Sequence, residues 1–209
     1  MLAVAGGKGG AGKTTTALGL AAAMTRSGPP VLVVDTDRDM PDLHAVAETP
    51  GEPGLGTLAD ADDAVPVRAV THESRRFPGV YVVPADGCRR PSDALAELVD
   101  DRPTILDCPA GAGRDAARPL RLADRSLLVS APTERGLRDT AKTAAMSRAV
   151  GTEPAGVILT RTDDRPDLGD LFDCPLLGSI PRGDAPALDD PSVRSAYRNI
   201  VRTTNLRNI

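Results

Sequence analysis

Apolar residues along the chain fall into short runs, and Gly, Pro or Asp bounds each run. Most of the runs are rich in β-branched residues, and none alternates with polar residues. This pattern is typical of strands that are buried on both faces. The expected strands are Leu2–Ala5, Val31–Val34, Val80–Val83, Thr104–Leu106, Ser126–Val129, Gly156–Leu159 and Leu176–Ile180.

Segments with a helical composition lie between several of these runs. Lys13–Arg26 is rich in Ala and Leu, and Asp93–Val99 is amphipathic. Glu134–Val150 is long, and Ser192–Thr203 is the last such segment. Strands that alternate with helices form right-handed crossovers. The sequence therefore predicts an α/β fold, with a mostly parallel twisted β-sheet flanked by helices on both faces.

Residues 36–78 show little periodicity and contain several Pro and Gly and the acidic run Asp60-Ala-Asp62-Asp63. We expect loops and short helices on the domain surface there, not a second domain. A length of 209 residues fits one domain with a buried core. The expected organisation is a single domain over residues 1–209.

Composition is ordinary for a globular protein, at 41% hydrophobic and 26% charged residues, with a net charge of −4. The basic residues are not ordinary, because only Lys8, Lys13 and Lys142 among 25 are lysine. GC-rich coding and a salt-adapted source both fit this bias. Two of the three lysines lie five residues apart near the N-terminus, and this placement calls for an explanation.

Several classes of protein are excluded. No stretch approaches the roughly 18 to 20 consecutive apolar residues of a membrane span, and no basic-then-apolar leader precedes the first motif. Cys88, Cys108 and Cys174 are widely spaced, which argues against a disulfide framework and a zinc site. Few aromatic residues are present to stack on single-stranded nucleic acid. We expect a cytoplasmic protein.

A glycine-rich motif follows the first strand and precedes the first helix. Residues 7–14 satisfy G-x-x-x-x-G-K-[ST], in which backbone N–H groups and a helix N-terminus bind phosphate. Lys13 can bridge two phosphates, and the Thr14 hydroxyl can ligate Mg²⁺. The alternative is a fortuitous glycine turn. The expected nucleotide-binding residues of this loop are Gly7, Lys8, Gly9, Gly10, Ala11, Gly12, Lys13, Thr14 and Thr15.

Lys8 makes the type of phosphate-binding loop more specific. The segment from Lys8 to Thr14 resembles the deviant Walker A motif, K-G-G-x-G-K-[ST], of the MinD/ParA family of P-loop ATPases, which have a Rossmann-like fold. The resemblance implies that Lys8 reaches the phosphates of the nucleotide bound by a partner subunit. It also implies an ATP-dependent homodimer. The alternative is a solvated loop lysine.

Aspartates follow two of the expected strands, at the sheet edge where ligands bind in open α/β folds. The segment Asp35-Thr36-Asp37, with Pro41-Asp42-Leu43 beyond it, resembles switch I of the family, which is D-x-D followed by a Pro-Asn/Asp-Leu-like stretch. The resemblance implies that Asp35 helps to hold Mg²⁺ and that Asp37 orients or deprotonates the attacking water. The alternative is a turn capped by Asp. We expect Asp39 and Asp42 to be solvated, and His44 to lie on the surface.

Asp107 directly follows the expected strand Thr104–Leu106, as the Walker B aspartate follows its strand, and such a residue acts on Mg²⁺. The following Pro-Ala-Gly resembles switch II, which implies that the Gly111 N–H senses the γ-phosphate. A simple turn is the alternative for Gly111. Cys108 is expected to be a small buried residue.

The C-terminal third resembles the same family. The strand that ends in Thr160-Arg161 resembles one that ends in Asn-Arg and contacts adenine, with Thr160 in place of the asparagine. The segment around Pro181 resembles a G-x-I-P-x-D turn near the base, with one extra residue before Asp184. Thr160, Arg161 and Pro181 are therefore expected at the nucleotide. Residues 45–78 match no motif of the family.

The resemblance implies an enzyme that binds Mg²⁺ and ATP and hydrolyses ATP slowly, as a switch that positions or partitions a cellular cargo. It also implies a protein activator. The basic residues Arg194, Arg198 and Arg202 of the last expected helix lie opposite apolar positions. A core helix, a peripheral membrane contact and a DNA contact all remain open.

Two further hypotheses stay open. The chain could be a binding module that uses ATP with negligible turnover. It could also be a metal-cluster carrier of the same superfamily, although such a carrier needs paired cysteines and the sequence shows none. A ligase such as dethiobiotin synthetase shares the fold but lacks an equivalent of Lys8.

Overall fold

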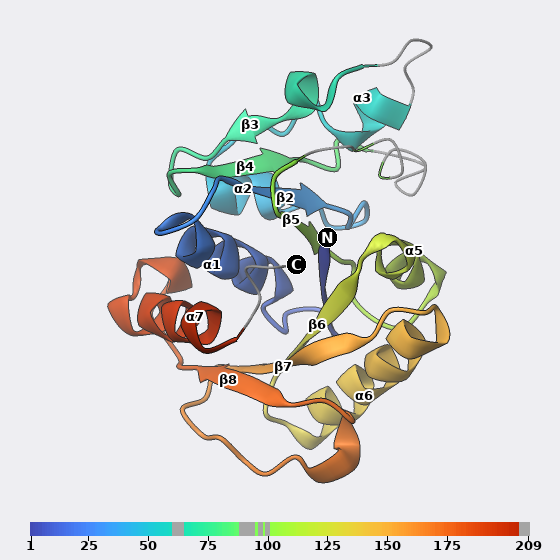
Figure 1. The fold of residues 1–209 in the computed structure, drawn as a ribbon, viewed down its shortest axis with the longest axis vertical. Helices are drawn as coiled ribbons and strands as arrows, with labels where there is room; N and C mark the ends of the chain where they lie inside the picture. The colour runs from blue at the N-terminus through green and yellow to red at the C-terminus, as the bar shows by residue number, and fades with distance from the viewer. Residues whose placement is uncertain (60–64, 88–94, 96–97, 99–100, 205–209) are drawn as a thin grey trace.

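The computed structural model describes residues 1–59, 65–87, 95, 98 and 101–204. Its centre is an eight-stranded sheet in the order β3-β4-β2-β5-β1-β6-β7-β8 (Figure 1). All neighbouring strands are parallel except β3 and β4, which are antiparallel. The strands are β1 (Leu2–Ala5), β2 (Val31–Asp35), β3 (His72–Glu73), β4 (Val80–Val83), β5 (Thr104–Asp107), β6 (Arg125–Ser130), β7 (Pro154–Thr160) and β8 (Leu176–Ile180).

Helices cover both faces of this sheet. In Figure 1, α1 and α7 lie on one side and α5 and α6 on the other. The α-helices are α1 (Lys13–Thr25), α2 (Leu43–Ala47), α3 (Leu55–Ala59), α5 (Arg114–Leu122), α6 (Glu134–Ala149) and α7 (Pro191–Thr203). Three short 3₁₀ helices are η1 (Val67–Val70), η2 (Gly169–Leu171) and η3 (Ala187–Asp189). The predicted fold class is therefore confirmed.

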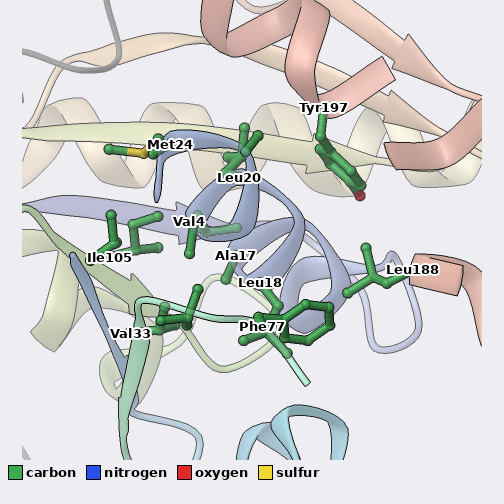
Figure 2. Packing of buried hydrophobic residues seen from close by; sticks show 14 of the residues in the cluster. Val4, Ala17, Leu18, Leu20, Met24, Val33, Phe77, Ile105, Leu188 and Tyr197 are labelled. Atoms are coloured by element: carbon green, nitrogen blue, oxygen red, sulfur yellow. The ribbon is translucent and has the colours of Figure 1, made fainter. Parts of the chain in front are cut away.

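The core is divided by the sheet, because successive residues of a strand point to opposite faces. In β1, Leu2 and Val4 pack with α1 and α7, whereas Ala3 and Ala5 belong to the cluster on the other face. Figure 2 shows the first cluster, in which Val4 and Ile105 of the sheet lie beside Ala17 of α1. Every residue of β1, β2 and β5 is buried, which explains their uninterrupted apolar runs.

All seven expected strands are present, and four of them extend one or two residues beyond the apolar run at one or both ends. The described elements that the pattern does not predict are β3, α5 and the 3₁₀ helices η2 and η3. The short helices expected within residues 36–78 are present, but Leu43 of α2 and Leu55 of α3 are completely buried, so they contribute to the core. The expected helix Asp93–Val99 lies largely outside the described residues.

Helix α7 is a core helix. Val193, Tyr197, Ile200 and Val201 on its apolar face are each no more than 2% exposed. This face packs against α1 and the sheet, so it is not free to lie on a membrane. Within the described parts of the chain, no helix combines the length and the apolar character that crossing a membrane requires.

Candidate functional site

The glycine-rich loop connects β1 to α1, and its backbone conformation requires glycine. Gly10 and Gly12 have φ angles of 73° and 91°, which L-residues with a side chain rarely adopt. Gly7 is constrained by packing, because a Cβ there would lie 2.1 Å from the main-chain carbonyl carbon of Asp139 in α6. Lys13 is the first residue of α1 and is only 8% exposed.

The end of β7 holds this loop in place. The Thr160 hydroxyl donates a hydrogen bond of 2.8 Å to the carbonyl oxygen of Ala11. The Arg161 guanidinium donates to the carbonyl oxygen of Gly10. On the other side, the Gly111 N–H donates to the carbonyl oxygen of Gly6 over 3.1 Å. The loop is therefore fastened to the segments that follow β5 and β7.

A cavity of about 600 Å³ opens beside the loop, within the size range of small-molecule sites. It brings together residues that follow β1, β2, β5, β7 and β8. The expected site residues in its lining are Gly9, Gly10, Gly12, Lys13, Thr14, Thr15, Asp37, Thr160, Arg161 and Pro181. Gly7, Lys8, Ala11, Asp35, Asp107 and Gly111 are not part of the lining.

Two buried carboxylates lie side by side at the base of the site. Asp35 and Asp107 are register partners in β2 and β5, and their exposed fractions are 1% and 2%. Burial raises the pKa of Asp35 to about 7, and backbone hydrogen bonds from Asp37 and Leu43 oppose the rise. Burial and the charge of Asp35 raise the pKa of Asp107 well above its ordinary value, although Thr14 and Lys13 oppose this.

Asp107 has a side-chain oxygen that lacks a partner. Its Oδ1 is buried and receives no hydrogen bond from any described residue. An unsatisfied buried carboxylate oxygen is costly unless a ligand or ion contacts it. Magnesium requires only one or two carboxylates when nucleotide phosphates supply further ligands. The residues therefore fit such an ion, although the described chain holds no cluster of three or more His, Cys, Asp or Glu suited to bind a metal by itself.

Asp35 organises the loop after β2. Its two carboxylate oxygens accept hydrogen bonds from the N–H groups of Asp37 (3.0 Å) and Leu43 (3.3 Å). Asp37 in turn accepts one from the N–H of Met40 over 3.2 Å. These bonds fold the segment back toward the glycine-rich loop, and Asp37 and Met40 both line the cavity.

Asp42 is a site residue for which the sequence analysis predicts no role in the site. It is exposed, as expected, but its carboxylate accepts a hydrogen bond of 3.0 Å from the Thr14 hydroxyl and it lines the cavity. The two residues are 28 positions apart, so no motif spacing connects them. The signal that could have found it is its place in Pro41-Asp42-Leu43, the stretch of the switch I resemblance that follows Asp35 and Asp37.

Lys8 is exposed in the loop, and so its ammonium group is accessible to another molecule. It lies near Asp139 of α6. The hydrogen bond from Lys142 is the largest cause of the lowered pKa of Asp139, and the charges of Lys142, Arg135 and Lys8 lower it further. Lys142 itself donates to Asp139 over 2.9 Å. This contact gives a structural role to the third lysine.

The described cysteines are separate from the site chemistry. Cys108 is 1% exposed, and burial raises the pKa of its thiol far above the ordinary value, so it acts as a small apolar residue, as expected. Cys174 lies in a different cluster beside α6. Cys88 is outside the described residues.

Comparison with known proteins agrees with this geometry. Residues 2–187 match the family described as the CobQ/CobB/MinD/ParA nucleotide binding domain. The chain is 31% identical over 218 aligned positions to an uncharacterised ATP-binding protein of Methanocaldococcus jannaschii, with 93% of this chain and 76% of the relative covered.

Two solved structures have the same fold over nearly their whole length. The cell division ATPase MinD of Pyrococcus furiosus superposes with a TM-score of 0.82 at 28% identity, covering 96% of both chains. The septum site-determining protein MinD of Pyrococcus horikoshii, solved with Mg-ADP, gives 0.82 at 25% identity, covering 97% of this chain and 94% of that one. The chain therefore belongs to the CobQ/CobB/MinD/ParA family of nucleotide-binding domains.

Proposed function

We propose that residues 1–209 act as a single P-loop ATPase domain that binds ATP with Mg²⁺ and hydrolyses it slowly. The observation that carries the proposal is the buried, unpartnered Oδ1 of Asp107 beside Lys13 and Thr14. A cation bound to the phosphates would contact this oxygen, and its positive charge would lower the raised pKa of the Asp107 carboxyl group. The Mg-ADP complex of the Pyrococcus horikoshii relative supports the choice of nucleotide and ion.

Each residue of the site has a role in this proposal. The backbone N–H groups of residues 7–15 bind the phosphates, and Lys13 neutralises them. Thr14, Asp35 and Asp107 hold Mg²⁺, which supplies charge neutralisation at the phosphates when bound. Asp37 orients or deprotonates the attacking water, and the Gly111 N–H senses the γ-phosphate.

The Thr14 hydroxyl has a protein partner, Asp42, in this structure. A hydroxyl that ligates Mg²⁺ through a lone pair can still donate its proton to a carboxylate. We therefore assign Asp42 a positioning role, in which it keeps the Thr14 oxygen directed toward the ion. Thr160 and Arg161 act in the same way on the loop, through Ala11 and Gly10.

Lys8 makes hydrolysis depend on a second subunit in this proposal. Its ammonium group is exposed on the loop and would neutralise phosphate charge across an ATP-dependent homodimer. A cation supplied by a partner accelerates phosphoryl transfer by about 10³–10⁵ in comparable systems. The enzyme is then a cytoplasmic switch that closes with ATP, opens after hydrolysis and responds to a protein activator.

The cargo that such a switch positions or partitions is a separate question. The apolar face of α7 is buried in the core, so a membrane contact through that face receives no support. DNA contact through the arginines of α7 also has no specific observation in its favour. We therefore propose positioning of a cellular cargo on the strength of the family alone.

Calorimetric titration with Mg-ATP tests the proposal, using Lys13→Ala and Lys142→Ala as a matched pair. Lys13→Ala should weaken binding by roughly 10- to 100-fold, since a hydrogen bond to a charged group contributes about 1.5–3 kcal/mol. Lys142→Ala should bind as the wild type does. Equal affinity of both variants would overturn the phosphate assignment.

A further inference from the structure

A second cavity, of about 520 Å³, lies between α1 and α7, beside the nucleotide cavity. We call it the α1–α7 cavity. Its lining includes Gly19, Ala22 and Ala23 of α1, together with Phe77, Pro78 and Leu188. Figure 2 shows Phe77, Leu188 and Tyr197 arranged around α1. None of the expected site residues lines it.

The charge of the α1–α7 cavity is unlike that of the whole chain. Its lining contains the four arginines Arg26, Arg76, Arg194 and Arg198 and a single acid, Asp189. The chain as a whole carries a net charge of −4. The cavity therefore concentrates positive charge on a protein that is negative overall, which favours an anionic occupant.

Only one of the four arginines has its charge paired within the described structure. Arg76 donates to Asp189 over 2.7 Å and to the carbonyl oxygen of Val46 over 3.2 Å. Its guanidinium also lies 5.2 Å from the centroid of the Phe77 ring. The side chains of Arg26, Arg194 and Arg198 form no hydrogen bond or ion pair with any residue that the structure describes. Three guanidinium groups are thus available to a ligand.

These features specify the chemistry of a ligand. A volume of this size suits a small molecule, and guanidinium groups bind phosphate and carboxylate through paired hydrogen bonds. Pro78, which is exposed, and Ala22, which is half-buried, supply apolar surface that a ligand can reach, whereas Phe77, Leu188 and Tyr197 lie behind it and are no more than 8% exposed. We propose that the α1–α7 cavity binds a small organic anion, with a phosphate or carboxylate group at Arg194 and Arg198 and an apolar body against Ala22 and Pro78.

Tyr197 connects this cavity to the nucleotide site, since it lines both. Its ring packs so closely on α1 that a Cβ at Gly19 would lie 2.5 Å from it. Its hydroxyl is 3.1 Å from the Thr16 hydroxyl, in the first turn of the helix that starts at Lys13. Tyr197 therefore links α7, which carries Arg194 and Arg198, to the phosphate-binding helix, and the proposal includes a regulatory role for the α1–α7 cavity. By linkage, nucleotide and anion change each other's affinity by the same factor.

Binding of three naphthalene probes tests the site. We would titrate 1-naphthyl phosphate, 1-naphthoate and neutral 1-naphthol and follow naphthalene fluorescence, which the chain does not obscure because it has no Trp. At least one anion should bind about tenfold or more tightly than 1-naphthol. The better anion identifies the natural group as a phosphate ester or a carboxylate. No saturable binding of either anion, or binding no tighter than that of 1-naphthol, would overturn the proposal.

Variants place the probe in the α1–α7 cavity. The double variant Arg194→Ala/Arg198→Ala should lose about tenfold in affinity for the anion. Arg202→Ala, on the same helix but outside the cavity lining, should lose nothing. Lys13→Ala should also bind the probe normally, which separates this site from the phosphate loop and keeps the test independent of the proposed ATPase activity. Full affinity in the double variant, with an unchanged melting temperature, would contradict the proposal.

Coupling is tested by repeating the titration with saturating Mg-ADP. The probe affinity should change by about fivefold or more in the wild type. The change should shrink in Tyr197→Phe, which keeps the ring but loses the hydrogen bond to Thr16. Identical probe affinities with and without Mg-ADP would rule out the regulatory role.

Discussion

The Thr160 hydroxyl donates a hydrogen bond of 2.8 Å to the main-chain carbonyl oxygen of Ala11, 149 residues away. Thr160 ends β7, and Ala11 lies in the middle of the phosphate loop. The hydroxyl, at 3.4 Å, also contacts the carbonyl oxygen of Ser130 at the end of β6. One side chain thus connects two neighbouring strands to the loop between β1 and α1.

Substitution of Thr160 by valine should loosen the loop. The shape is retained but the buried carbonyl of Ala11 loses its donor, so the free energy of unfolding should fall by about 1 kcal/mol. The ratio of ATP to GTP affinity should stay unchanged, because the hydroxyl is directed to the loop. Chemical denaturation and nucleotide titration measure the two quantities. A changed ratio of ATP to GTP affinity would show instead that Thr160 contacts the nucleotide base.

Alanine at position 7 should be far more disruptive than alanine at position 9. A Cβ at Gly7 would lie 2.1–2.5 Å from backbone atoms of α6, so the helix must shift, whereas nothing lies within 4 Å of a Cβ at Gly9. We expect Gly7→Ala to lower the free energy of unfolding by about 1–3 kcal/mol or more and Gly9→Ala to have a much smaller effect. Equal losses in denaturant titrations would refute this packing argument.

The fold could be predicted where the pattern reflects local burial. Strands buried on both faces appear as uninterrupted apolar runs, and α1, α6 and α7 have helical composition over 13 to 16 residues. Helix α5 is not predicted, because it is short and contains Pro119, although its buried residues Ala116, Ala117 and Leu120 follow helical spacing. Strand β3 has only two residues, and it forms by antiparallel pairing with β4.

The candidate site also has one part that the sequence predicts and one part that it does not. The phosphate loop and the aspartates that end β2 and β5 belong to contiguous motifs, so their neighbours in space follow from the order of parallel strands. The contacts of Asp42 with Thr14 and of Tyr197 with Thr16 could not be predicted, because they span 28 and 181 residues. Such contacts depend on how loops and helices pack after the sheet has formed.

Tyr197 should titrate abnormally. Burial raises the pKa of Tyr197 to about 12, and the hydrogen bond with Thr16 opposes the rise. Because the folded state holds the proton more tightly than the unfolded state, this contribution to stability is complete below about pH 10 and is lost as pH rises through about 12.

Absorbance of the phenolate measures this shift. The titration of the wild type minus that of Tyr197→Phe should give one phenol with a midpoint near pH 12, and Tyr81→Phe serves as the control, since the chain has two tyrosines. A midpoint near pH 10 for Tyr197 in the folded protein would show that its ring is not buried.

Removal of the Asp37 carboxylate should slow ATP hydrolysis without preventing ATP binding. Loss of a general base reduces turnover by about 100-fold or more, so Asp37→Ala should accumulate in its ATP-bound, dimeric form. The exposed neighbour Asp39, which contacts only Arg38 among the described residues, provides the control Asp39→Ala. A phosphate-release assay and light scattering follow the two properties. Normal turnover in Asp37→Ala would remove Asp37 from the mechanism.

The central claim is that an exposed lysine in the phosphate loop makes hydrolysis depend on a second subunit. Its most direct test is the mass in solution of Lys8→Ala with saturating Mg-ATP, measured by light scattering beside the wild type and Lys142→Ala. The wild type and Lys142→Ala should shift from 21.7 kDa to twice that mass. Lys8→Ala should bind ATP, remain at 21.7 kDa and lose turnover. A Lys8→Ala protein that forms the dimer and hydrolyses ATP at the wild-type rate would contradict the account.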